Sequence, residues 1–271
     1  MKKILFAIMM AIALTVGCTE QKRTSTEDVG DTDADSAMVA TDEDGWLPKA
    51  AENLFDDFFY NFATNSYVQA KRICFPLPVA DGRKTSRIDS TEWQMDQFYM
   101  EKGEMTLLFD NIEQMDLTRD TTVSEAIVER IMLDVDTVVQ YMFSRATGRW
   151  MLENVCLQTI GNNRNASFLT FYKQFVADSV YQRKSLNKEI AFSGPDPDDE
   201  FEEMEGVITP DFWDAFAPEL PSGTIYNVVY GLPGHRSDSI VFVIRRLADD
   251  AETDITFKRH NGKWKLMKLT E

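Results

Sequence analysis

The sequence predicts an α+β protein with two tandem cone-shaped domains, in each of which an N-terminal helix packs on a strongly curved antiparallel sheet. Aromatic residues recur at helical spacing at the start of each half, and strand-like runs then follow without helical crossovers between them. The two halves also resemble each other in sequence. Of the 271 residues, 44% are hydrophobic and 27% are charged, which is the balance of a globular chain with a core.

Each half opens with a predicted helix that carries one wide aromatic stripe. The apolar residues recur at i, i+3, i+4 and i+7 in both halves. They are Leu54, Phe55, Phe58, Phe59 and Phe62 in the first half and Phe168, Phe171, Tyr172 and Phe175 in the second. Such a stripe is typical of a helix that is buried on one face, so we expect a sheet to cover it.

The predicted strands follow as short runs rich in β-branched and aromatic residues. They are 105–109, 126–135, 137–145 and 149–157 in the first half, and 224–230, 239–245, 254–259 and 263–269 in the second. Asn261-Gly262 predicts a type I′ hairpin between the last two strands, and Thr147-Gly148 is a weaker version at the equivalent place. Because consecutive strands without crossovers pair antiparallel, we expect an antiparallel sheet in each half.

The chain aligns with itself in two separate places. Residues 55–71 match 168–184 at an offset of 113, and residues 143–152 match 257–266 at an offset of 114. Two nearly equal offsets indicate that a whole domain was duplicated; the alternative is a coincidence of two common patterns. The predicted domains are 46–160 and 161–271, with residues 161–165 as the joint.

Residues 1–17 predict a lipoprotein signal peptide. Lys2 and Lys3 precede an apolar run, 4–16, that is too short to span a bilayer permanently. Residues 14–18, Leu-Thr-Val-Gly-Cys, resemble a lipobox, although Thr15 stands where that pattern prefers Leu. We therefore expect acylation of Cys18, including palmitate, and a membrane anchor through this N-terminal lipid. The alternative is an ordinary signal peptide followed by an incidental cysteine.

An acidic disordered tether is predicted over residues 18–45. This segment holds nine acidic residues against two basic ones and has no apolar periodicity. Self-repulsion would extend it and hold the folded part away from the membrane. The expected location is the cell envelope of a Gram-negative bacterium, anchored in the outer membrane, on either its periplasmic or its surface face.

The charge of the chain excludes some classes of function. With 45 acidic and 28 basic residues, the formal net charge is −17, so we expect no nucleic-acid partner. The sequence has no nucleophile elbow, phosphate-binding Gly-rich loop, His-Glu-x-x-His helix or Cys-x-x-Cys pair. We therefore predict no catalytic residue, no metal site and no cofactor.

Carboxylates offer the alternative chemistries. Asp134, Asp136, Asp254 and Tyr226 lie on or near predicted strands and would suit proton transfer if an apolar wall tuned the acids; solvated strand ends are the simpler interpretation. Seven acidic residues between 196 and 205 would offer oxygen ligands to calcium but lack the spacing of an EF-hand. We expect that segment to be a solvated loop leading into a short helix.

Five aromatic residues in the second half are the candidate lining of a pocket or groove. They are Phe212, Trp213, Phe216, Tyr226 and Tyr230. The alternative is that they fill the core beneath the second sheet. Cys74 and Cys156 both belong to the first half and are expected either to pair or to be two buried thiols.

The lipobox, the acidic spacer and the duplicated helix-then-sheet unit together resemble the envelope lipoproteins grouped as domain of unknown function 4348. The resemblance includes Ile-Thr-Pro-Asp-Phe-Trp at 208–213, Leu-Pro at 220–221 and Tyr-Gly at 230–231. It covers nearly all of the chain after Gly45 and implies a tandem of nuclear transport factor 2-like folds. It brings no catalytic residue with it, and the wider superfold serves isomerases, dehydratases, ligand binders and interaction modules alike.

The function that we expect is non-enzymatic binding by a membrane-anchored envelope lipoprotein. The bound partner would be a small ligand, a peptide or a glycan, or an envelope protein. One alternative is an envelope scaffold that uses its sheet faces for protein contacts. A second alternative is a carboxylate-based lyase or isomerase in the cone cavity.

Overall fold

The computed structural model describes residues 49–196, 199–231, 237–249 and 251–271. The predicted signal peptide, Cys18 and the acidic tether therefore lie outside the described residues. No helix in the described part is both long and apolar enough to cross a membrane.

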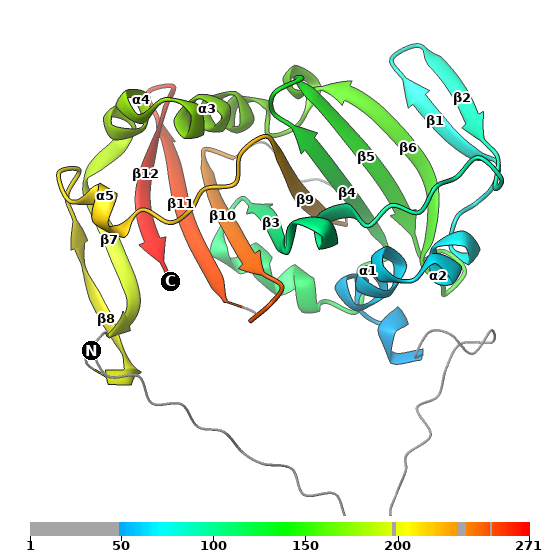
Figure 1. Ribbon diagram of the computed structural model, residues 1–271, viewed down its shortest axis with the longest axis horizontal. Helices are drawn as coiled ribbons and strands as arrows, with labels where there is room; N and C mark the ends of the chain where they lie inside the picture. Colours follow the sequence, from blue (N-terminus) through cyan, green and yellow to red (C-terminus); the bar gives the residue numbers. More distant parts are fainter. Residues whose placement is uncertain (1–48, 197–198, 232–236, 250) are drawn as a thin grey trace, which may run out of the picture. The chain divides into compact units, whose positions relative to one another are not determined.

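The described residues form two six-stranded sheets with helices packed against them (Figure 1). The first sheet has the order β2-β1-β6-β5-β4-β9 and the second β3-β10-β11-β12-β7-β8. The strands of the first are β1 (Leu77–Asp81), β2 (Lys84–Ile88), β4 (Glu125–Met132), β5 (Thr137–Ser144), β6 (Met151–Thr159) and β9 (Thr224–Tyr230). Those of the second are β3 (Glu104–Phe109), β7 (Leu186–Asp196), β8 (Asp199–Ile208), β10 (Ser239–Arg246), β11 (Glu252–His260) and β12 (Lys263–Thr270). The α+β class is therefore confirmed.

The two halves of the chain have the same order of elements. Each begins with a helix pair, continues with a hairpin and a short helix, and ends with four strands. The helices are α1 (Phe55–Thr64), α2 (Ser66–Lys71), α3 (Ala166–Ala177), α4 (Ser179–Lys184) and α5 (Trp213–Phe216). Short 3-10 helices are η1 (Lys49–Glu52), η2 (Phe98–Lys102), η3 (Ile112–Arg119) and η4 (Ile160–Asn162).

The halves exchange one strand. β3 belongs to the first half by sequence but pairs with β10, and β9 belongs to the second half but pairs with β4. The predicted domains, 46–160 and 161–271, are continuous stretches of chain and do not coincide with the two sheets. Each sheet takes one end strand from the other half of the chain. The two exchanged strands also contact each other. Tyr226 N on β9 donates a hydrogen bond to Thr106 Oγ1 on β3 at 2.9 Å.

The aromatic stripes form two hydrophobic cores. The stripe of α1 packs in one core, whose residues include Trp150, Tyr226 and Tyr230. The stripe of α3 packs in the other, whose residues include Trp213, Phe242 and Trp264. Each core includes residues from the other half of the chain, as the strand exchange requires. The prediction that a sheet covers each stripe is therefore confirmed.

Several local expectations need correction. The acidic segment 196–205 is not a loop in its described part, since Asp196 ends β7 and residues 199–205 belong to β8, which pairs with β7. This hairpin and β1–β2 escaped the strand prediction because β2 up to Arg87 and residues 202–207 of β8 are exposed on both faces and so show no alternation of apolar and polar residues. The sheets are also not wholly antiparallel, because β1 pairs parallel with β6 and β7 parallel with β12. Residues 82–150 separate β1 from β6, and a connection that long can return in the parallel direction.

The two cysteines in the described part are both free. Cys74 is exposed and Cys156 is half-buried. The expectation of two buried thiols is therefore wrong for Cys74, which lies just after α2 at the surface.

Candidate functional site

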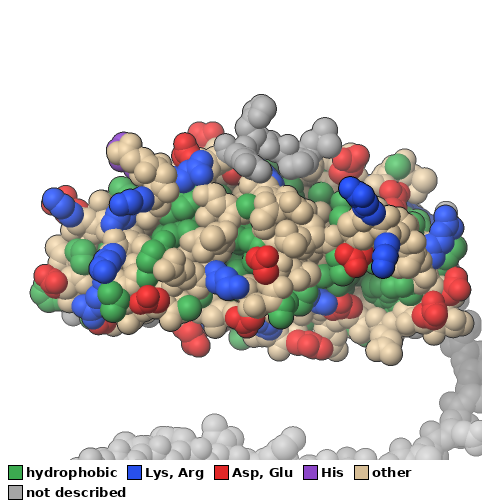
Figure 2. Space-filling model, turned by 90° about the horizontal axis from the view of Figure 1, so that it is seen from above, with side chains coloured by type: hydrophobic (Ala, Val, Ile, Leu, Met, Phe, Trp, Pro, Cys, Tyr) green, Lys and Arg blue, Asp and Glu red, His purple; other side chains and the backbone are tan. Residues whose placement is uncertain are grey.

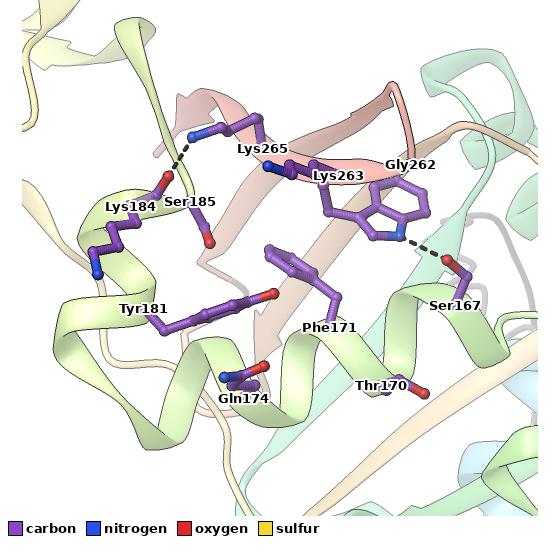
Figure 3. Close-up of a pocket in the computed structure, with 11 residues that line it drawn as sticks. Ser167, Thr170, Phe171, Gln174, Tyr181, Lys184, Ser185, Gly262, Lys263 and Lys265 are labelled. Carbon is purple, nitrogen blue, oxygen red and sulfur yellow. Dashed lines mark hydrogen bonds between the residues drawn. The ribbon is translucent and has the colours of Figure 1, made fainter.

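A cavity of about 520 Å³ lies between α3, α4 and the β11–β12 turn (Figure 3). Its walls come from two helices on one side and the start of β12 on the other. The lining residues are Ser167, Thr170, Phe171, Gln174, Tyr181, Lys184, Ser185, Gly262, Lys263, Trp264 and Lys265. Three of them are aromatic and three are lysines.

The helix side of the cavity is shaped by the junction of α3 and α4. Asp178 ends α3 and caps α4, because its Oδ1 accepts hydrogen bonds from Val180 N at 2.9 Å and Tyr181 N at 3.0 Å. This cap turns the chain so that the Tyr181 ring lies 6.0 Å from the Phe171 ring, measured between centroids. Figure 3 shows Tyr181 reaching from α4 toward Phe171, with Gln174 beside it.

The strand side depends on the tight turn between β11 and β12. Asn261 and Gly262 both have positive φ, 49° and 76°, as the predicted type I′ hairpin requires. Because the turn has only two residues, β12 begins at Lys263. Lys263 and Trp264 therefore line the cavity opposite α3 at the very start of the strand.

Trp264 is fixed in place by polar contacts at its edge and a cation over its face. Its Nε1 donates a hydrogen bond to Ser167 Oγ at 3.0 Å, and Arg259 Nη1 donates to the same oxygen at 3.0 Å. The Arg259 guanidinium lies 5.6 Å from the Trp264 ring centroid, and its Nε donates to Asp238 Oδ1 at 2.6 Å. The indole therefore forms a rigid wall.

Basic side chains surround the cavity. Lys265 Nζ donates hydrogen bonds to the backbone carbonyls of Lys184 and Leu186, which joins β12 to the end of α4. The side chains of Lys184 and Lys263 are exposed, and among the described residues neither forms an ion pair. The cavity is therefore a local positive site in a chain whose net charge is −17. Figure 2 shows that charges of both signs are spread over the face it displays, with hydrophobic side chains between them.

Sequence reasoning missed these residues, although one signal for them was present. Between residues 255 and 270 there are five basic residues and no acidic one, in an otherwise acidic chain. They are Lys258, Arg259, Lys263, Lys265 and Lys268. A basic hairpin of this kind identifies a surface that is suited to anions.

The five aromatic residues predicted to line a pocket are not brought together. Phe212 is 66% exposed, Trp213 is fully buried, and Phe216 packs on Phe192 with ring centroids 5.4 Å apart. Tyr226 and Tyr230 lie in the other hydrophobic core. None of the five lines the cavity between α3, α4 and β12.

The four residues considered for proton transfer are also dispersed. Asp134 and Asp136 are exposed near the β4–β5 turn, and the Tyr226 hydroxyl accepts a hydrogen bond from Arg130 Nε at 2.9 Å. Asp254 is partly buried on β11, and desolvation raises its pKa to about 6. The value of about 6 also includes a smaller rise caused by Glu252 and the opposing effects of Lys268 and Arg245 on the pKa of Asp254.

A buried acid does face a tyrosine elsewhere in the molecule. Tyr230 donates a hydrogen bond to Asp56 Oδ1 at 2.7 Å, and burial raises the pKa of both groups. The rings of Phe55 and Phe109 pack on Tyr230, with centroids 6.3 and 6.4 Å away. The pair therefore belongs to the core of the first sheet and does not line the cavity between α3, α4 and the β11–β12 turn.

Metal ligands are not grouped in the described part of the chain. No cluster of three or more His, Cys, Asp or Glu side chains there could hold a metal ion. His260, at the end of β11, is exposed.

Comparison with known proteins identifies the fold and the family. A crystal structure of a nuclear transport factor 2-like protein from Bacteroides fragilis is 34% identical and superposes with a TM-score of 0.74. The match covers 81% of this chain and 96% of that one. The search of curated proteins found no match. The family model for domain of unknown function 4348 matches residues 33–271. The chain therefore belongs to the domain of unknown function 4348 family and has a nuclear transport factor 2-like fold.

Proposed function

We propose that the protein is a membrane-anchored envelope lipoprotein that binds a ligand, without transforming it, in the cavity between α3, α4 and the β11–β12 turn. One observation supports this most directly. The cavity has fixed aromatic walls, Phe171, Tyr181 and Trp264, and a few polar groups that converge on it. Its volume of about 520 Å³ lies in the range of ligand sites in proteins.

The composition of the lining favours binding over catalysis. It contains no carboxylate, histidine or cysteine, so it offers no carboxylate or imidazole base beside its serines and no metal ligand set. The acid–tyrosine pair Asp56–Tyr230 lies in the core beneath the first sheet instead. A carboxylate-based lyase or isomerase therefore has less support than a binding protein.

The binding test uses the Trp264 indole as a reporter. The chain has five tryptophans, so a Trp264→Phe variant assigns the Trp264 Nε1–H resonance in a nitrogen-15 correlation spectrum. The probes are indole, N-acetylglucosamine, a neutral dipeptide amide and a short acidic peptide. We expect at least one to shift the Trp264 resonance at millimolar concentration. The Thr170→Trp variant, which fills the cavity from the exposed side of α3, should abolish the shift. If no probe moves the resonance, the proposed site is wrong.

The membrane anchor is a separate part of the proposal. Cys18 follows the lipobox-like segment, and acylation there would hold the protein in the outer membrane of a Gram-negative envelope, with residues 18–45 as an acidic spacer. Radiolabelled palmitate should label the wild-type protein and not the Cys18→Ala variant. Absence of label in the wild type, with both proteins in the same membrane fraction, would exclude the anchor.

A scaffold function is favoured by one observation. The described part of β8 forms an exposed edge, and apolar side chains on and after it face solvent: Met204, Val207, Phe212 and Phe216. Exposed apolar groups at a sheet edge are typical of protein contacts. A photo-crosslinker at position 207 should then capture one defined envelope protein, and Phe212→Asp should prevent the capture while leaving probe binding at Trp264 unchanged.

A further inference from the structure

The duplication allows the cavity to be compared with the equivalent place in the first half. After each helix pair, a backbone carbonyl accepts a hydrogen bond from the last strand: Leu152 N donates to Arg72 O at 2.8 Å, and Leu266 N donates to Ser185 O at 2.9 Å. Ser185 therefore occupies the position of Arg72.

The tryptophan walls correspond as well. The Arg145 guanidinium lies 5.4 Å from the Trp150 ring centroid, as Arg259 lies 5.6 Å from that of Trp264. The helix pairs agree in detail, because Asn65 caps α2 as Asp178 caps α4. The two sites are thus equivalent in backbone and in aromatic walls.

In the first half, a peptide segment with a carboxylate occupies this place. Glu52, at the end of η1, lies with Oε1 2.6 Å from Arg72 Nη2, and its Oε2 accepts a hydrogen bond from Trp150 N at 3.1 Å. The backbone carbonyl of Glu52 accepts from Arg145 Nη1 at 2.7 Å. The Arg72 side chain is 3% exposed and Trp150 is fully buried, so the site is closed.

In the second half, the equivalent place has neither the arginine nor the carboxylate. Ser185 supplies no cation, and at the offset of 113 Asn165 stands where the first half has Glu52. Ser167 Oγ accepts the hydrogen bond that Trp264 Nε1 donates. The cavity of about 520 Å³ opens between Ser185 and Trp264, and Lys184, Lys263 and Lys265 supply the positive charge around it.

We propose that this cavity binds an acidic peptide from another molecule, with a carboxylate directed to Lys184 and Lys263 and the peptide lying against Phe171 and Trp264. The inference rests on the proposed function and adds the class of ligand. The peptide would repeat, between molecules, the contact that Glu52 makes within the chain. Because lysine ammonium groups at the surface bind carboxylates weakly, the affinity should be modest and should fall with added salt.

The test uses two matched peptides. The first is acetyl-Ala-Ala-Glu-Asn-Leu-amide, the sequence of residues 50–54, and the second has Gln in place of Glu. Binding is followed by titration of the Trp264 indole resonance of the full chain. We expect the Glu peptide to bind more tightly than the Gln peptide, and Lys263→Ala or Lys184→Ala to weaken it about two- to fivefold, the size of one exposed ion pair. Lys71→Ala, at the position in α2 that corresponds to Lys184, is the matched control and should change nothing.

Each other outcome has a definite meaning. Equal binding of the two peptides, or binding that ignores both lysines, overturns the acidic-peptide assignment and leaves the binding site intact. The same holds if neither peptide binds while indole or N-acetylglucosamine shifts Trp264. If no probe of any kind shifts Trp264, the proposed function fails together with the inference.

Discussion

Asn227 on β9 donates a hydrogen bond from its Nδ2 to Glu129 Oε2 on β4 at 2.8 Å, and its Oδ1 accepts one from Leu108 N on β3 at 2.8 Å. One side chain therefore joins both exchanged strands to the first sheet. Glu129 is fully buried, and its Oε1 accepts from Asn163 at 2.7 Å and from Gln140 at 2.9 Å. A buried carboxylate is retained here because polar neighbours from three parts of the chain donate to it.

Replacing Asn227 by Leu should lower the free energy of unfolding by about 3 kcal/mol, because Glu129 and the Leu108 N–H would each lose a buried partner. Chemical denaturation measures the change, and Asn162→Ala on the exposed joint is the control. Since the halves share strands, we expect one transition for the described domains. Two separate transitions in the wild type would show that the exchange does not couple them.

Removing the carboxylate of Glu52 should also destabilise the protein. Glu52→Gln removes the negative charge 2.6 Å from the Arg72 guanidinium, which is 3% exposed, and we expect a loss of about 3 kcal/mol. Asp214→Asn breaks a comparable pair with Arg183 at the surface, where the side chains are 51% and 66% exposed, and should change stability by less than about 1 kcal/mol. Similar effects of the two variants on the denaturation midpoint would contradict the distinction.

Asp254 should make stability fall as pH rises. Its pKa in the folded protein, about 6, is above the ordinary value of 3.8. Between about pH 4 and pH 6 the Asp254 carboxyl is therefore protonated in the folded state and ionised in the unfolded state. This favours folding below about pH 4, and the benefit is lost as pH rises through about 6. Asp254→Asn should remove this slope and raise stability near neutral pH by about 1 kcal/mol, a value reduced for solvent screening. Thermal unfolding across the range measures it, with exposed Asp211→Asn as control. An unchanged slope in Asp254→Asn would rule out this origin.

The β11–β12 turn should tolerate glycine replacement poorly. A Cβ at Gly262 would meet no atom within 4 Å, so the cost of Gly262→Ala comes from its φ of +76° and should be about 1 kcal/mol. Gly206→Ala is the control. A Cβ at Gly206 also meets no atom within 4 Å, and the φ of Gly206 is not in the positive range that favours glycine. Denaturation of both variants measures the difference. A cost at Gly206 equal to that at Gly262 would mean that backbone conformation is not the cause.

The sequence predicts the helices and the hairpin turn because both depend on local chemistry. Phe168 and Phe171 lie on the buried face that their spacing requires, and Asn261-Gly262 adopts the positive φ values that its turn type needs. The exchange of β3 and β9 could not be predicted in this way. A strand such as Met105 to Phe109 presents the same alternation of side chains whether it pairs with β4 or with β10, and only the path of the connections decides between them.

The cavity was missed for a different reason. The self-alignment that revealed the duplication ended at Lys71 and Lys184, and the next pair, Arg72 and Ser185, is where the two sites diverge. Of the aromatic residues predicted instead, Trp213, Tyr226 and Tyr230 fill the two cores because they are large and mostly apolar, whereas Phe212 and Phe216 are exposed. The aromatic content of a sequence does not distinguish residues that line a cavity from residues that fill a core. A difference between equivalent positions in a duplicated chain does distinguish them.

The crossing of β3 and β9 also says something about how such a chain could arise. A single half that carried its own β3 could satisfy every pairing by lending that strand to a second copy and accepting one in return, which is a domain-swapped dimer with twofold symmetry. Joining the two copies through residues 160–165 would turn that dimer into one covalent unit. Afterwards each copy was free to diverge at the position after its second helix, keeping an arginine on one side and a serine on the other.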